Sequence, residues 1–407
     1  MTRPAWSTKR RCISAGVRSV REGKVSKGAD DSLQLYERAR DCCEAAVGGT
    51  REHAVRSVPD ISVRTGGAHL SIRELMEERE YEILSPYASH SRESEGRLKP
   101  EEPCDIRTCY QRDRDRILHS KSFRRLKNKT QVFLEPEGDH YRTRLTHTLE
   151  VSQIARTIAK ALSLNEDLTE AIALGHDLGH TPYGHSGEAA LNALLLEAGI
   201  GHFRHNEQSV RIVEILEKDG QGLNLTRETV DGILNHGTAN MPKTLEGRVV
   251  RLSDKIAYIN HDIDDAIRAG VLEEQDLPEE FTAVLGHSVK SRLNRLIHDI
   301  ITESTGKEDI LQSKAVGDAM FGLRSFMHRA VYRSTRVKAE EEKAQNMLKA
   351  LYHYYEQHLD RIPESYTRLM EQGEKKEIVI CDYISGMTDQ FAVREYEELF
   401  IPKGWTE

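Results

Sequence analysis

Apolar residues recur at helical spacing along the chain from about Ser71 to its end, beginning with Ile72, Leu75 and Met76. Alternating apolar and polar runs, which are typical of half-buried strands, are nearly absent, and no Gly/Pro/Ser-rich linker interrupts the pattern. We therefore predict an all-α fold of helices joined by short loops, with a short pair of strands at most.

Four of the predicted helices can be placed well enough to position chemistry. They cover about residues 146–164, 167–178, 206 onward and 247–269. The last of them spaces its apolar residues three and four apart, which is the pattern of a helix with one buried face. Gly179 follows the second helix, where we expect it to adopt the left-handed conformation that ends many helices. Asn206 is suited to cap the third.

Residues 1–70 differ from the rest of the chain. They hold 13 Lys/Arg and 8 Asp/Glu, a charge of +5, which leaves −13 for the remainder of a chain with a net charge of −8. We expect a disordered N-terminal extension, because such a segment cannot bury enough apolar surface to offset its ordering entropy. Two other readings are upstream sequence translated from a start codon assigned too early and, less favoured, a targeting peptide.

The overall composition is that of an ordinary globular protein, with 38% hydrophobic and 30% charged residues. No apolar run approaches the roughly 18 residues that a membrane span requires. The six cysteines form no CxxC pair and no regular framework, which excludes a zinc ribbon and a disulfide scaffold. We therefore expect a cytoplasmic protein that does not associate with membranes.

Positive charge is concentrated between Arg107 and Lys129, where nine basic residues accompany only Asp113 and Asp115. An acidic protein with an anionic ligand has to gather positive charge locally. The stretch could therefore contact nucleotide phosphates or single-stranded nucleic acid. A solvated basic face explains the same charges equally well.

Histidines cluster in the middle of the chain, where seven of the 18 fall between positions 140 and 205. These seven are His140, His147, His176, His180, His185, His202 and His205. Imidazole and carboxylate groups together suit Mn²⁺, Fe²⁺, Ni²⁺, Co²⁺ or Zn²⁺. The adjacent His176 and Asp177, at a predicted helix end, are candidates to share one such ion.

His147 and Asp254 allow two interpretations each. His147 lies on the buried face of its helix, where a lone histidine is more often a core residue than a ligand. An antiparallel helix pair would nevertheless bring it to His176 and Asp177. Asp254 lies opposite the apolar stripe of its helix, and spacing alone indicates a solvated position there.

The order His147, His176-Asp177, Asp254 resembles the H…HD…D signature of the HD-domain phosphohydrolases. The sequence resembles the dGTPase-like branch of that superfamily more closely, from about Ile72 to the end. The similar segments are Gln111–Phe133, Tyr141–Arg156, Ala173–Glu188, Phe203–Ile212, Gly222–Thr226, Arg251–Gly270 and Asp382–Asp389. An ordered series of this kind is far more specific than an HD dipeptide.

The resemblance implies a fold and a reaction. It implies an HD-domain helical bundle with its metal-binding core at about 107–270 and additional C-terminal helices at about 271–407. It also implies metal-dependent hydrolysis of a deoxynucleoside triphosphate (dNTP) to a deoxynucleoside and inorganic triphosphate. The chain would then assemble as a homo-oligomer, a tetramer or a hexamer.

The resemblance also implies roles for individual residues. One divalent metal ion (Mn, Mg, Fe, Ni, Co or Zn) would be bound by His147, His176, Asp177 and Asp254. The catalytic pair would be His185 and Glu188. The phosphates would be contacted by Arg144, His180 and His205, and the triphosphate and deoxyribose would be held by Gln131, Lys255, Tyr258 and Asp262.

The chemistry of this residue set agrees with hydrolysis at phosphorus, which needs a cation near the non-bridging oxygens and a proton donor for the leaving oxygen. The GxxxxGK[ST] and GxGxxG nucleotide-binding motifs are missing from the sequence. Two alternatives stay open. One is an HD-type 5′-nucleotidase or phosphodiesterase, and the other is a catalytically silent nucleic-acid-binding relative.

Overall fold

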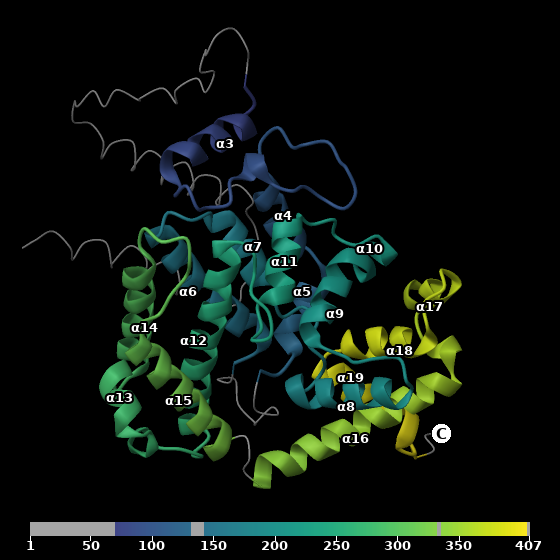
Figure 1. Ribbon diagram of the computed structural model, residues 1–407. Helices are drawn as coiled ribbons and strands as arrows, with labels where there is room; N and C mark the ends of the chain where they lie inside the picture. The colour runs from purple at the N-terminus through teal and green to yellow at the C-terminus, as the bar shows by residue number, and fades with distance from the viewer. Residues whose placement is uncertain (1–69, 132–141, 332–334, 405–407) are drawn as a thin grey trace, which may run out of the picture. The chain divides into compact units, whose positions relative to one another are not determined.

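The computed structural model of the protein describes residues 70–131, 142–331 and 335–404, all within one compact unit, Ser62–Glu407. Helices and loops make up these residues (Figure 1), and the only β-type contacts among them are two isolated bridges, Arg97–Thr226 and Thr130–Thr143. The prediction of an all-α fold is confirmed. The extension expected over residues 1–70 lies outside the described residues except for Leu70.

The helices of the first part of this unit carry the histidine-rich segments. They are α3 (Ile72–Ile83), α4 (Cys109–Leu118), α5 (Lys121–Arg125), α6 (Arg144–Ala161), α7 (Glu166–Gly175), α8 (Gly184–Glu197), α9 (His205–Arg211), α10 (Glu217–Gly220), α11 (Arg227–Asn235) and α12 (Leu245–Arg268).

The remaining helices form the C-terminal part. They are α13 (Glu279–Leu285), α14 (Val289–Ser304), α15 (Lys314–Ala330), α16 (Thr335–Gln357), α17 (Glu364–Glu371), α18 (Lys376–Ser385) and α19 (Asp389–Phe400). Within the part of the chain that the structure describes, no helix combines the length and apolarity of a membrane span.

Helices α6, α7, α11 and α12 pack side by side and position the candidate site (Figure 1). The N-termini of α6, α7 and α12 are capped by the side chains of Thr143, Asn165 and Thr244, which accept hydrogen bonds from backbone N–H groups of the first turn. Apolar residues of α6, α7 and α12 belong to the largest buried cluster of the described residues, which also takes in residues of α14 and α15. The predicted helices at 146–164 and 247–269 are confirmed as α6 and α12.

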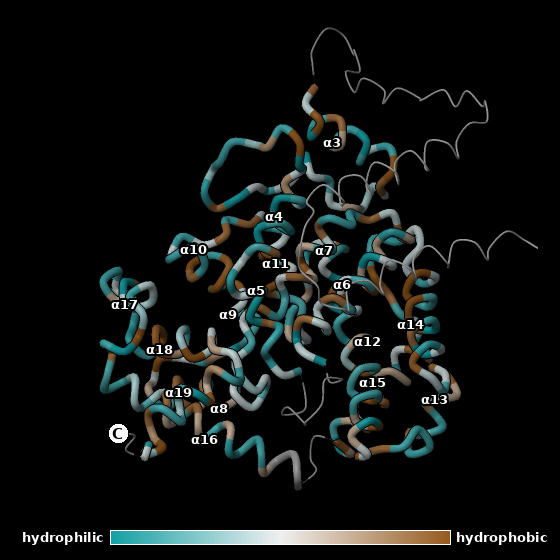
Figure 2. Tube along the Cα trace, turned by 180° about the vertical axis from the view of Figure 1, so that it is seen from behind, coloured by the Kyte–Doolittle hydropathy of each residue, from teal (hydrophilic) through white to brown (hydrophobic). Residues whose placement is uncertain are grey.

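The C-terminal helices pack on two sides of this group. Helices α14 and α15 contact α12, whereas α16 and α18 contact α8. The second set buries its own apolar cluster, which includes Leu191 and Leu348. Figure 2 shows hydrophilic and hydrophobic positions alternating along most of these helices, as expected of helices with one buried face.

Two local predictions are wrong. Gly179 is not left-handed; instead, a Cβ atom at this position would lie 2.2 Å from the backbone N of Ser209 and 2.3 Å from the carbonyl oxygen of His205. The glycine therefore permits close approach of α9. Asn206 does not cap α9, because the N-cap of this helix is Arg204. The side-chain amide of Asn206 instead donates to the carbonyl oxygen of Leu234 at 2.7 Å.

Candidate active site

The four residues implied as metal ligands lie together where α6, α7 and α12 meet. The Nε2 atom of His147 lies 3.1 Å from Oδ1 of Asp254, and Nε2 of His176 lies 3.8 Å from the same oxygen. Ligand atoms of these three residues all lie within 4.8 Å of one another. Asp177 adjoins them, with its Oδ1 atom 3.4 Å from Nε2 of His176. The arrangement could hold a divalent ion.

His176 presents a lone pair to this cluster. It is the C-cap of α7, and its Nδ1 atom lies 2.7 Å from the carbonyl oxygen of Ala173. Because a carbonyl oxygen can only accept, Nδ1 carries the proton and Nε2 carries the lone pair. This Nε2 atom is buried without a hydrogen-bond partner among the described residues. A metal ion would satisfy it, as the second nitrogen of a metal-binding histidine commonly donates to a carbonyl group.

His147 is oriented by a chain of two further residues. Its Nδ1 atom lies 3.3 Å from Nδ1 of His261, whose Nε2 atom lies 2.6 Å from Oε2 of Glu150. The carboxylate favours a proton on Nε2 of His261, which leaves Nδ1 of His261 free to accept from Nδ1 of His147. His147 then directs its own lone pair from Nε2 towards Asp254.

Both carboxylates of the cluster favour the ionised form. Burial alone would raise the pKa of Asp177, but the two flanking imidazoles and the Arg144 guanidinium hold that pKa well below its usual range. Burial is likewise outweighed at Asp254, where the neighbouring His147 and His176 rings lower the pKa. Ionised carboxylates beside neutral imidazoles form a suitable ligand set for a divalent cation.

His185 and Glu188 lie on the first turns of α8 and contact each other. The Nδ1 atom of His185 lies 3.1 Å from Oε2 of Glu188, and the His185 side chain is 64% exposed, so its other nitrogen can reach a ligand. Glu188 also accepts from the backbone N–H of His205 at 2.9 Å and lies 3.0 Å from Nδ1 of that residue. Burial opposes ionisation, but these hydrogen bonds lower the pKa of Glu188.

The residues implied to contact phosphates lie between these two groups. Arg144 is buried and donates from Nη1 to Oδ2 of Asp177 at 2.8 Å. The His180 ring stacks on the ring of His205, with centroids 4.0 Å apart, and its Nε2 atom lies 3.2 Å from Oδ1 of Asp177. Burial lowers the pKa of His180 well below its usual range. Arg144 is thus the fixed positive charge beside the candidate metal ligands.

The polar face of α12 is not a solvated face, so the interpretation from spacing alone is wrong. Lys255 and Tyr258 are half-buried and Asp262 is buried. Burial lowers the pKa of Lys255 to about 8 and raises the pKa of both Tyr258 and Asp262. Asp254, Tyr258 and Asp262 follow one another at intervals of one turn, which places all three on the face that carries the metal cluster. Gln131 is buried as well.

The loop between α7 and α8 is held by the C-terminal helices. Lys129 is buried, and its Nζ atom donates to the carbonyl oxygen of His180 and to that of Ser385, the latter at 2.7 Å. Asp389, at the start of α19, accepts from the backbone N–H of Tyr183 at 3.0 Å. Burial lowers the pKa of Lys129 to about 7. These contacts give a structural reason for the similarity of the segment Asp382–Asp389 to the dGTPase-like proteins.

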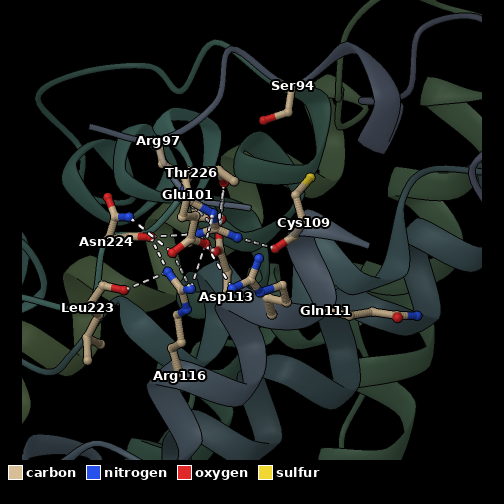
Figure 3. A network of polar contacts seen from close by, with 12 residues as sticks. Ser94, Arg97, Glu101, Cys109, Gln111, Asp113, Arg116, Leu223, Asn224 and Thr226 are labelled. Atoms are coloured by element: carbon tan, nitrogen blue, oxygen red, sulfur yellow. Dashed lines mark hydrogen bonds and ion pairs between the residues drawn. The ribbon is translucent and has the colours of Figure 1, made fainter. Parts of the chain in front are cut away.

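Much of the basic stretch between Arg107 and Lys129 is paired within the protein, since Arg107, Arg112, Arg114, Arg116 and Lys121 each contact a carboxylate. Figure 3 shows the contacts around Arg116 and Asp113. Asp113 is fully buried, forms an ion pair with Arg97 and accepts from the backbone N–H of Thr226 at 2.9 Å. Arg116 contacts Glu101 at 2.6 Å. The stretch therefore presents less unpaired positive charge than its sequence indicates.

His236, which no sequence pattern singled out, adjoins the candidate metal ligands. His236 is the buried C-cap of α11, and the centroid of its ring lies 5.0 Å from that of His176. Its Nδ1 atom lies 2.7 Å from the carbonyl oxygen of Ile233, three residues earlier, as Nδ1 of His176 does from Ala173. A histidine at the C-terminal end of a helix was the signal that both share.

Comparisons with known proteins agree with this geometry. The HD domain matches residues 144–259, and the phosphohydrolase-associated domain matches residues 310–398. A deoxyguanosinetriphosphate triphosphohydrolase-like protein of Caldanaerobacter subterraneus subsp. tengcongensis is 58% identical over 339 residues, which cover 83% of this chain and 98% of that protein.

Proteins with the same name occur among more distant relatives. One from Clostridium perfringens is 50% identical over 343 residues (82% of this chain, 99% of that protein), and one from Geobacter sulfurreducens is 40% identical over 370 residues (78% and 95%). A crystal structure of a hypothetical protein from Aquifex aeolicus is similar at a TM-score of 0.41 and 19% identity over 72% of this chain and 68% of that one, which supports no argument. On the extent of the sequence matches, the chain belongs to the deoxyguanosinetriphosphate triphosphohydrolase-like family of HD-domain phosphohydrolases.

Proposed function

We propose that the protein hydrolyses dNTPs to deoxynucleosides and inorganic triphosphate. The observation that carries the proposal is the placement of the His185–Glu188 pair and Arg144 beside the cluster that could hold a metal ion. The names of the relatives support a nucleoside triphosphate as the substrate. The hydrolysis of such a substrate requires positive charge and a proton donor at the same place.

His147, His176, Asp177 and Asp254 would hold one divalent ion. When bound, such an ion withdraws electron density from phosphate oxygens and stabilises the negative charge that develops there. The buried lone pair of His176 and the ionised state of the two carboxylates fit a cation at this position.

His185 is suited to deliver the proton to the leaving 5′-oxygen. Nδ1 of His185 donates to Glu188, so the protonated ring carries the proton to be donated at Nε2, on the exposed side. Arg144 is held in place by Asp177 and would contact the phosphates as a fixed cation, which requires no rearrangement when the substrate binds.

Gln131, Lys255, Tyr258 and Asp262 would hold the rest of the nucleotide. The Oε1 atom of Gln131 is buried without a hydrogen-bond partner among the described residues, so it can accept from a sugar hydroxyl. Burial raises the pKa of the Asp262 carboxyl, and a protonated carboxyl can donate to a ligand. Lys255 supplies a further cation for the triphosphate.

The test is incubation of each dNTP with Mn²⁺, Mg²⁺ or Co²⁺, followed by chromatographic separation of the nucleoside and phosphate products. We expect equimolar deoxynucleoside and inorganic triphosphate. Orthophosphate, or an opened cyclic phosphate from a cyclic nucleotide, would support the 5′-nucleotidase or phosphodiesterase alternative. Salt-dependent binding of single-stranded DNA without any hydrolysis would support the silent relative.

A further inference from the structure

The turn that leads into α8 has a strained backbone. Tyr183 adopts a φ of 59° and a ψ of 25°, and Gly184 follows with a φ of 54°. The left-handed conformation is unfavourable for a residue with a Cβ atom, so it persists at Tyr183 only where surrounding contacts hold it. His185 comes directly after this turn, in the first turn of α8. The direction in which the His185 side chain points therefore depends on what holds the turn.

A carboxylate from the C-terminal part of the chain contacts this turn. Asp389, the first residue of α19, is buried, and its Oδ1 atom accepts from the backbone N–H of Tyr183 at 3.0 Å. Its Oδ2 atom accepts from the backbone N–H of Thr130 at 2.8 Å and from the hydroxyl of the same residue. One carboxylate thus joins the turn before His185 to the residue that precedes Gln131.

The same turn packs against two residues that would hold the nucleotide. A Cβ atom on Gly184 would lie 2.7 Å from Nη2 of Arg144 and 3.4 Å from the carbonyl oxygen of Gln131. Glycine is therefore needed at this position for close approach as well as for its positive φ. The backbone N–H of Arg144 in turn donates to the carbonyl oxygen of Lys129 at 3.0 Å. The turn, Gln131 and Arg144 consequently form one packed unit.

We propose that Asp389 is a positioning residue for the proton donor. It fixes His185 relative to Gln131 and Arg144. The inference rests on the proposed function, in which His185 protonates the leaving oxygen of a nucleotide held by the other two residues. Proton transfer requires the donor within hydrogen-bond distance of that oxygen, so a small displacement of His185 lowers the rate.

Simple docking of the C-terminal helices is the competing explanation. Asp389 would then only stabilise the fold, and its loss would loosen every part of the site alike. Lys129 also attaches the loop to these helices, through the carbonyl oxygens of His180 and Ser385, so the loop keeps one attachment when the other is weakened. The two explanations differ in one respect. Only a positioning role acts through His185, and its effect is lost when His185 is replaced.

The test is a double-mutant cycle on the full chain, which combines Asp389→Asn with His185→Gln. The amide keeps the shape of Asp389, but its nitrogen cannot accept, so the contact with either Tyr183 or Thr130 is lost. We expect Asp389→Asn to lower the rate of hydrolysis by about 10–100-fold in the wild-type background and to have almost no further effect in the His185→Gln background. A displaced Gln131 would raise KM in both backgrounds, so the rates are compared at saturating dNTP.

Asp299→Asn is the matched control. The Oδ2 atom of Asp299 also accepts from a backbone N–H, that of Ser313 at 2.9 Å, but it does so between α14 and the N-cap of α15. This variant should keep wild-type turnover. Because Asp389 contacts Thr130 and Tyr183, outside the cluster of candidate metal ligands, Asp389→Asn should keep its bound Mn²⁺ in elemental analysis.

The outcomes separate this inference from the proposed function. Equal fold losses in the two backgrounds, wild-type turnover in Asp389→Asn, or loss of Mn²⁺ from that variant overturns the positioning role and leaves the proposed function intact. Absence of hydrolysis in the wild type contradicts the proposed function itself. If circular dichroism shows that Asp389→Asn does not fold, Asp389→Glu enters the same cycle, because it keeps the charge and displaces the carboxylate by one methylene group.

Discussion

The guanidinium of Arg144 lies 2.8 Å from Oδ2 of Asp177, and both side chains are buried. Asp177 is therefore a partner of a buried cation as well as a candidate metal ligand. Removal of one partner of a buried ion pair leaves the other charge without compensation and typically costs about 3–5 kcal/mol. Substitutions at Asp177 consequently mix the loss of metal with the loss of stability.

Asp254→Asn is a cleaner test of the metal ligands. Asp254 has no Lys or Arg partner among the described residues, so the isosteric amide should abolish hydrolysis and reduce bound metal while leaving the free energy of unfolding of the metal-free protein nearly unchanged. Asp177→Ala should lose metal too, but should unfold more easily by about 3–5 kcal/mol. Elemental analysis and urea unfolding check both variants. Full metal content in Asp254→Asn would contradict the assignment.

His185→Gln tests the proton donor. Because His185 lies on α8 with an exposed side chain and outside the cluster of His147, His176 and Asp254, the variant should keep its metal. Turnover should fall by about 10²–10⁴-fold, the usual contribution of a positioned proton-transfer group. Single-turnover kinetics with product separation measure the effect. Wild-type turnover in this variant would show that His185 has only a structural role.

Glu150→Gln tests the chain that orients His147. The amide keeps the shape of Glu150 but no longer holds the proton on Nε2 of His261, so the tautomers of His261 and His147 lose their definition. Loss of such an indirect contact commonly lowers metal affinity by about 10–100-fold. Isothermal titration with Mn²⁺ measures it, and Glu356→Gln on α16 is the control. Equal affinities in the two variants would refute the role of this chain.

Lys129→Met tests the buried amine. Burial lowers the pKa of Lys129 from 10.5 to about 7, so between these values the unfolded state binds more protons than the folded state. The contribution of Lys129 to the free energy of unfolding therefore increases as pH rises from about 7 to 10.5. Relative to the variant, the metal-free wild type should gain stability across this window. Parallel urea-unfolding curves with a constant difference would show that the amine does not titrate there.

Removal of the residues before Gly67 tests whether the N-terminal segment, which lies outside the described residues, is needed for folding and activity. A chain that begins at Gly67 keeps every residue of the candidate site and both segments matched by the two domain families. We expect it to fold, bind metal and hydrolyse dNTPs like the full chain, since residues 1–70 show no sustained apolar period. Aggregation or inactivity of the shortened protein, with a sound full chain, would show that the segment is structural.

Periodicity predicted the helices but not which polar faces form the site. The apolar stripe of α12 is regular enough to give its bounds closely, yet the same reasoning assigned Asp254 to solvent. The periodicity of a helix distinguishes apolar from polar positions. It does not distinguish a polar face that lines a buried site from a polar face that is exposed to solvent. Only the resemblance placed Asp254 among the ligands.

Contacts between segments that are distant in the sequence could not be predicted from local sequence patterns either. Gly179 reads as a helix terminator because the rule considers its own helix, whereas its role is set by the backbone of α9 some thirty residues later in the sequence. His236 lies beside His176, and His261 lies beside His147. Neither spacing nor composition in the sequence links the residues of either pair. Their part in the site follows from the packing of α11 and α12 against α7 and α6.

The hydrogen bonds of Lys129 and Asp389 to the loop between α7 and α8 couple the position of this loop to the C-terminal helices. One end of each contact lies near His185, the proposed proton donor, and the other lies on α18 or α19, more than 200 residues away along the chain. A shift of these two helices is transmitted through short hydrogen bonds to the segment that carries His180 and leads into His185. The position of His185 relative to the candidate metal ligands therefore depends on the packing of α18 and α19 as well as on α8 itself.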